Sequence, residues 1–74
     1  MQVDGYEVQI MNKDEHTIGM EWFHDIESAL SYSLRIADAY SFLGVPVIVE
    51  TYKYYDTKPA TLVERIESIP GYSY

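Results

Sequence analysis

The feature that most constrains the fold is one capped, amphipathic segment between Asp25 and Gly44. Asp25 can accept hydrogen bonds from the first free helical amides, and Glu27 adds negative charge in the first turn, where the helix dipole favours it. Gly44 supplies the left-handed residue that ends many helices, and Pro46 prevents continuation. The sequence therefore predicts a helix over Ile26–Leu43.

This helix has one apolar face and one polar face at 100° per residue. The polar face holds Glu27, Ser31, Arg35 and Asp38. The apolar face holds Ile26, Ala29, Leu30, Ile36, Ala37 and Tyr40, with Leu34 at its margin. Ser33 lies within this apolar stripe, and together with Ala29 and Ala37 it makes the stripe shallow. A shallow stripe suits close packing of the helix across a sheet.

The remaining segments have the patterns of strands and turns. Residues 6–11 and 17–22 each alternate in side-chain type and are separated by a polar turn, which predicts a β-hairpin. Val45 to Tyr55 is rich in β-branched and aromatic residues and predicts a third strand, with Pro46 only at its start or at an edge. Thr61 to Ile69 fits either a strand, which we slightly favour, or a short helix with a Thr61 capping box, and Pro70 ends it.

The order of elements is thus β-β-α-β-(β). It predicts a single domain over residues 1–74, a small two-layer α+β fold with an antiparallel or mixed sheet and one helix on one face. One helix covers one side of such a sheet, so we expect the other side to be available for binding.

Composition narrows the class of partner. The chain has 74 residues and a formal charge of 5 − 12 = −7, with no cysteine. This acidity opposes direct binding to nucleic acid, which requires clustered Lys and Arg. The sequence shows neither a signal peptide nor an apolar run of about 20 residues that would span a membrane, so we expect a cytoplasmic protein. The absence of cysteine removes disulfides and thiolate zinc sites.

Catalytic and cofactor motifs are missing from the pattern. His16 and His24 match no standard metal-ligand spacing, the serines have no partnered histidine, and the four glycines are isolated rather than grouped into a phosphate loop. We expect no enzyme activity, no metal and no cofactor.

The aromatic residues are more informative. Alternation along the third strand places Tyr52 and Tyr54 on one side of the sheet with Glu50, and Tyr55 and Asp56 follow at the strand end. Rings of this kind are enriched at protein interfaces. We therefore select Glu50, Tyr52, Tyr54, Tyr55 and Asp56 as candidate partner-binding residues, with Trp22 as an anchor if it is not in the core. The alternatives are self-association through this face and a plain solvated covering of the sheet.

The acidic residues also have two interpretations. They keep a small protein soluble, or they imitate a phosphate track and occupy a basic groove of a nucleic-acid-handling protein. The set is Glu7, Asp14, Glu15, Glu21, Glu50, Asp56, Glu64 and Glu67.

The layout of a hairpin, a helix beginning Asp25-Ile26-Glu27-Ser28-Ala29-Leu30 and a Val-rich strand resembles small phage-encoded inhibitor proteins. It is similar to the phage inhibitor of bacterial RNA polymerase and to several anti-CRISPR proteins, in element order, size and acidity rather than in any shared motif. The resemblance implies a non-enzymatic inhibitor that masks a basic surface of a bacterial nucleic-acid-handling or defence complex. The alternative is a structural or assembly protein that forms a homodimer through its open sheet face.

Overall fold

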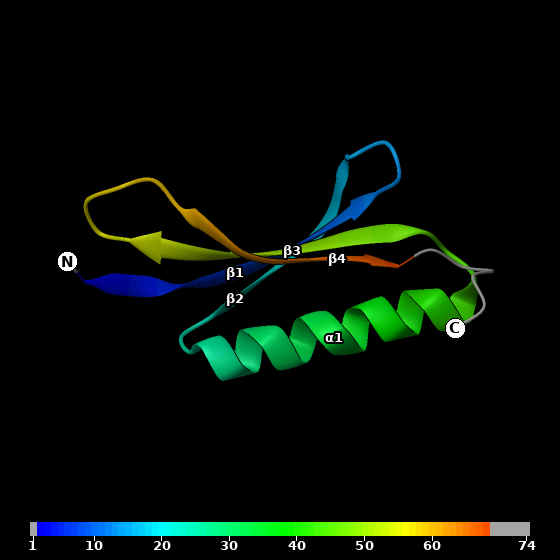
Figure 1. Ribbon diagram of the computed structural model, residues 1–74, viewed down its shortest axis with the longest axis horizontal. Coiled ribbons are helices and arrows are strands. Elements are labelled where there is room, and N and C mark those ends of the chain that lie inside the picture. Colours follow the sequence, from blue (N-terminus) through cyan, green and yellow to red (C-terminus); the bar gives the residue numbers. More distant parts are fainter. Residues whose placement is uncertain (1, 69–74) are drawn as a thin grey trace.

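The computed structural model describes residues 2–68, which form one helix and four strands (Figure 1). In chain order these are β1 (Val3–Asn12), β2 (Thr17–Phe23), α1 (Ile26–Leu43), β3 (Val47–Tyr55) and β4 (Thr61–Ser68). The predicted two-layer α+β fold is confirmed. The segment Thr61–Ser68, whose sequence pattern fits either a strand or a short helix, is a strand. The predicted terminator Pro70 and the residues around it lie outside the described residues.

The four strands form one sheet in the spatial order β2-β1-β3-β4, and every neighbouring pair is antiparallel. The sheet is therefore antiparallel, not mixed. α1 carries the chain from the edge strand β2 across β1 to β3 and covers one side of the sheet (Figure 1). We call the opposite side the open face.

The helix begins and ends where its capping residues predict. The Asp25 carboxylate accepts hydrogen bonds from the backbone N–H and the hydroxyl of Ser28, each at 2.9 Å. The backbone bond from Ser28 lowers the pKa of Asp25 below its ordinary value. At the other end Gly44 has φ 77°, and its N–H bonds to the Ser41 carbonyl at 3.1 Å. Local chemistry thus determines both ends of α1.

The core lies between α1 and the sheet. Three small residues of the helix, Ala29, Ser33 and Ala37, are buried against the sheet. Their short side chains bring the helix backbone close to the strands, and two hydrogen bonds fix it there. The Ser33 hydroxyl shares its one proton between the Leu30 carbonyl of its own helix, at 2.8 Å, and Glu64 Oε1 of β4, at 3.1 Å, and the Ser68 hydroxyl donates to the Ala37 carbonyl at 3.1 Å. The apolar centre of this core is Val8, Ile10, Ala29, Ala37, Val47 and Val49.

Some predicted boundaries differ from the structure. β1 begins at Val3, earlier than the alternation from Tyr6 indicates, because it pairs with the end of β3. β3 begins at Val47, directly after Pro46, whose missing N–H cannot join the ladder. Leu34, at the margin of the apolar stripe, is 55% exposed. The helix contacts the sheet mainly through the small residues Ala29, Ser33 and Ala37, and this narrow contact does not reach Leu34.

A substitution at Ser33 tests this contact. Ser33 is fully buried between α1 and the sheet. Ser33→Leu should therefore overpack this contact, break the bond to Glu64 and lower the free energy of unfolding by roughly 1–3 kcal/mol. Thermal unfolding followed by circular dichroism measures the loss. The control is Ser31→Leu on the exposed side of the same helix, which should leave the melting temperature nearly unchanged. Equal melting temperatures for the two variants would contradict the packing described.

Candidate binding face

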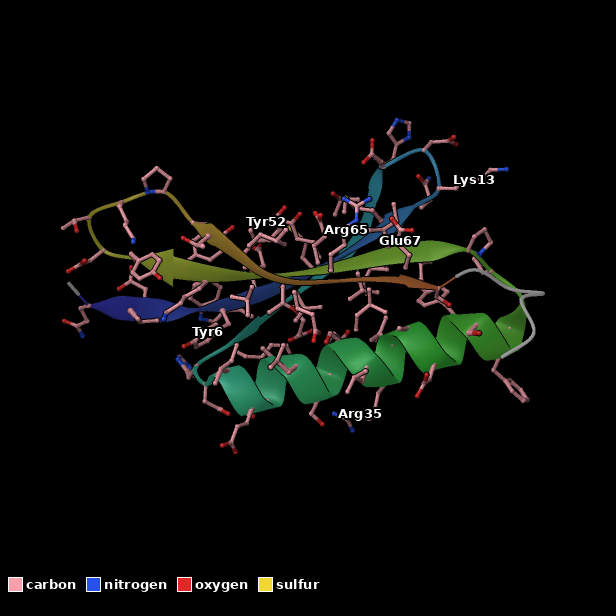
Figure 2. The ribbon with its side chains drawn as sticks, in the orientation of Figure 1. Tyr6, Lys13, Arg35, Tyr52, Arg65 and Glu67 are labelled. Carbon is pink, nitrogen blue, oxygen red and sulfur yellow. The ribbon has the colours of Figure 1, made fainter. Side chains whose placement is uncertain are left out.

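The open face carries most of the candidate site residues. Strand pairing places Glu7 of β1 between Trp22 of β2 and Tyr52 of β3, and it places Glu50 of β3 opposite Arg65 of β4. Figure 2 shows Tyr52, Arg65 and Glu67 on the side away from the helix, whereas Tyr6 lies between the sheet and the helix. Side chains from all four strands therefore meet on one surface.

Glu50 forms the first of two glutamate-centred clusters. Its Oε1 accepts the hydroxyl of Tyr52 at 2.8 Å, and its Oε2 accepts Arg65 Nη1 at 3.2 Å. Arg65 Nη2 also donates to Glu67 Oε1 at 3.1 Å, and this bond raises the pKa of Arg65. Glu50 is only 7% exposed. Its charge is thus compensated by a guanidinium and held away from solvent.

Glu7 forms the second cluster, and its surroundings differ. Its Oε1 accepts the side-chain amide of Gln9 at 2.7 Å and the hydroxyl of Tyr54 at 2.9 Å. Both donors are neutral, and across residues 2–68 the only ion pairs are those of Arg65 with Glu50 and Glu67. Glu7 is half-buried. The open face therefore holds one oriented carboxylate that no cation of the described chain neutralises.

Trp22 lies beside this carboxylate and is fixed in place. Its ring packs against Tyr54 with centroids 5.3 Å apart and planes tilted by 59°. A Cβ atom built on Gly5 would overlap Trp22 Cζ2 and lie 2.9 Å from the Phe23 carbonyl oxygen, so the ring sits directly on the glycine backbone. Trp22 is nevertheless 43% exposed. The indole is thus fixed by its neighbours and still has an aromatic surface that is accessible to solvent.

Two of the predicted residues lie apart from this group. Tyr55 follows Tyr54 in β3, so alternation directs it to the other side of the sheet, where the Nζ of Lys58 lies 4.2 Å from its ring centroid. Asp56 is exposed just beyond the strand. In Figure 1 this end of β3 extends past the start of α1, so the helix does not cover Tyr55. The structure brings together Glu50, Tyr52, Tyr54 and Trp22, and it leaves Tyr55 and Asp56 at the margin.

Sequence reasoning missed three contributors. The sequence pattern places Glu7 only among the surface acids and Gly5 only among four isolated glycines, and it indicates no role for Arg65. The role of Glu7 depends on the pairing of β1 with β3, which are distant in the sequence, whereas Gly5 contacts β2 and Arg65 pairs across the β3–β4 hairpin, so their roles depend on strand register. The available signal was the alternation of residues 6–11, which directs Glu7 away from Tyr6 and Val8.

The described residues show no metal-binding arrangement. Between residues 2 and 68, no three His, Asp or Glu side chains come together in a way that could hold an ion. His16 and His24 are exposed at the hairpin turn and before α1. In the same range, no helix has the length and apolar character needed to cross a membrane.

Comparison with known proteins adds no relative: no family model matches the chain, and no curated protein or solved structure matches it at a significant level. The function is therefore inferred from the chain's own residues.

Replacing Gly5 tests how Trp22 is held. Gly5→Ala should displace the indole and destabilise the β1–β2 pair, because the new methyl group meets both the ring and the Phe23 carbonyl. Trp22 is the only tryptophan, so its fluorescence emission reports the displacement directly. Gly19→Ala is the matched control on β2, since its nearest neighbour, Ile10 Cδ1, would lie at 3.4 Å. An unchanged Gly5→Ala spectrum would contradict this contact.

The tyrosine–glutamate bonds predict a pH dependence. Hydrogen bonding to Glu50 raises the pKa of Tyr52, and hydrogen bonding to Glu7 raises the pKa of Tyr54, with burial adding to both. A pKa raised by folding contributes stability that is fully present below about pH 10 and is lost as the pH rises through the folded-state value. The free energy of unfolding should therefore fall more steeply above pH 10 in the wild type than in Glu7→Gln, in which the pKa of Tyr54 is raised less. Absorbance at the phenolate band measures the titration, and an ordinary pKa for Tyr54 would contradict the bond.

Proposed function

We propose that this chain is a small, non-enzymatic binding protein that acts through its open face on a basic surface of a partner protein. The proposed setting is a phage-encoded inhibitor that occupies such a surface on a bacterial nucleic-acid-handling or defence complex. The partner-binding residues are Trp22, Glu50, Tyr52 and Tyr54, with Tyr55 and Asp56 at the margin.

The observation that carries the proposal is the combination of the exposed Trp22 ring and the half-buried Tyr52 and Tyr54 rings with an unneutralised carboxylate at Glu7. Rings that are held in place lose little conformational entropy on binding, which is why tyrosine and tryptophan dominate binding energy at interfaces. A half-buried carboxylate flanked by such rings gains most from a partner that supplies a cation. Both features favour a protein partner with basic side chains.

The net charge supports the same choice. The register places three carboxylates, Glu7, Glu50 and Glu67, and the cation Arg65 on the open face, and Lys13 of the hairpin turn lies near Glu67. The whole chain carries −7. A field of one sign steers a partner of the opposite sign and raises the association rate at low salt. This negative field would attract a basic protein surface of the kind that normally binds a phosphate backbone.

Kinetics of capture test the proposal. The chain is immobilised, the partner is isolated from bacterial lysate and identified by mass spectrometry, and the rates are measured with the purified partner. Trp22→Ala and Tyr52→Ala should each speed dissociation by about tenfold or more, because each removes roughly 1.4 kcal/mol or more of buried ring contact. Phe42→Ala, a 91% exposed ring at the end of α1, is the control and should have no effect.

Charge and salt give the second half of this test. Asp56→Lys should slow association at low salt more than Asp38→Lys on the polar side of α1, although both make the same change in net charge. Charge reversal at Glu50 would also reduce association, but Glu50 is buried against Arg65, so that variant disturbs folding as well. Association that does not weaken between low and high salt would remove the basic-surface proposal.

A second function has one observation in its favour. The edge strand β2 exposes Ile18 and Met20, at 49% and 60%, beside Trp22. An apolar edge with unpaired backbone groups is a site at which a second copy can pair. Sedimentation over a concentration series separates the two functions, because a homodimer dissociates on dilution and is strengthened by salt, which screens the repulsion between two acidic chains. A monomer at all concentrations would exclude it.

A further inference from the structure

We propose that Glu7, together with the rings of Trp22 and Tyr52, forms a receptor for one arginine side chain of the partner. This inference rests on the proposed function, because it names the chemistry by which the open face recognises a basic protein. It concerns a single position rather than the acidity of the whole surface.

The first step is the state of the carboxylate. The Gln9 amide and the Tyr54 hydroxyl both donate to Oε1 of Glu7, and no described residue donates to Oε2. Two bonds on one oxygen orient the carboxylate without neutralising it. By contrast, both oxygens of Glu50 are occupied, and one of them is bonded to Arg65. Glu7 is the glutamate of the central strands that still has acceptor capacity for a cation.

The second step is the shape of the surroundings. Glu7 is paired with Trp22 on one neighbouring strand and with Tyr52 on the other, so aromatic residues occupy the positions on both sides of it. The chain itself holds these rings: Trp22 sits on Gly5 and against Tyr54, whose hydroxyl reaches Glu7, and Tyr52 is tied to Glu50. A side chain that brings a cation to Oε2 therefore approaches Glu7 between residues whose rings the chain already holds. The site is therefore preorganised by contacts within the chain.

The third step distinguishes arginine from lysine. A guanidinium is planar, is weakly hydrated and stacks on aromatic rings while its N–H groups donate to a carboxylate in the same plane. An ammonium is compact and strongly hydrated, and it loses more solvation in a half-buried position. A carboxylate between rings, with one free oxygen, matches the guanidinium better. The chain also provides a precedent, since Arg65 already binds Glu50 beside Tyr52 on the same face.

The test uses N-acetyl-arginine amide as a probe, with the emission of Trp22 as the readout. Because Trp22 is the only tryptophan, the emission reports the surroundings of this one ring. We expect a saturable change with the arginine probe, at least fivefold weaker binding of N-acetyl-lysine amide, and no saturable change with the neutral citrulline analogue. Equal responses to arginine and citrulline, or no saturation with arginine, would overturn the proposal.

Two variants locate the effect. Glu7→Gln keeps an oxygen that accepts the Tyr54 hydroxyl but removes the charge, and it should weaken the arginine probe at least tenfold. Glu67→Gln is the matched control, because it removes a carboxylate from the same face that already pairs with Arg65. Its affinity for the probe should be that of the wild type. Circular dichroism verifies that each variant is folded. Equal affinities for Glu7→Gln and wild type would refute the assignment.

Partner capture separates this inference from the proposed function. If Trp22→Ala speeds dissociation of the partner while Glu7→Gln does not, the open face binds its partner but Glu7 is not the arginine receptor. If Glu7→Gln abolishes binding of the arginine probe while Trp22→Ala and Tyr52→Ala leave partner capture unchanged, the receptor exists but the proposed function is wrong. If both variants weaken capture and the arginine probe competes with the partner, both are supported.

Discussion

The close contact between α1 and the sheet is the constraint on which the rest of the structure depends. Ala29, Ser33 and Ala37 let the helix backbone approach the strands, and the bonds from Ser33 to Glu64 and from Ser68 to Ala37 fix it toward β4. In a chain of this size the only helix of the described part is used on that one side. Among residues 2–68 no second layer covers the opposite side of the sheet, and its side chains find their hydrogen-bond partners along the strands.

The arrangement of rings and acids on the open face follows from this. Tyr52 and Tyr54 cannot be buried under another layer, so each lies along the sheet and donates its hydroxyl to a glutamate. The carboxylates are therefore not free surface charges that serve only for solubility. They position the rings, and their own charge is either compensated, as at Glu50 by Arg65, or bonded only to neutral donors, as at Glu7. The difference between the two glutamates comes from which edge strand supplies a cation.

How much of this is predictable from the sequence depends on whether the cause is local. The bounds of α1 follow from Asp25 and Gly44, which act on adjacent residues, and the β1–β2 hairpin follows from one polar turn. β4 was ambiguous because its apolar residues fit both periods, and its pairing with β3 decides the outcome. The neighbours of Glu7 were not predictable, because Tyr52 and Tyr54 reach it only through pairing across more than 40 residues of chain. The contact of Trp22 with Gly5 lies within the β1–β2 hairpin, and it depends on the register of that pair, which the polar turn alone does not determine.

The two edges of the sheet differ in a way that bears on what the open face can bind. β4 carries Glu64, Arg65 and Glu67, and alternating charge of this kind opposes pairing with another strand. β2 has Glu21 as its only charge, and its Met20 and Trp22 continue the open face to the edge. Aromatic and apolar contacts alone would suit a second copy as well as a foreign protein. The charge of −7 distinguishes them, because it repels an identical chain and attracts a basic one. Under the proposed function, this acidity selects a basic partner over a second copy of the chain, which the rings alone would not distinguish.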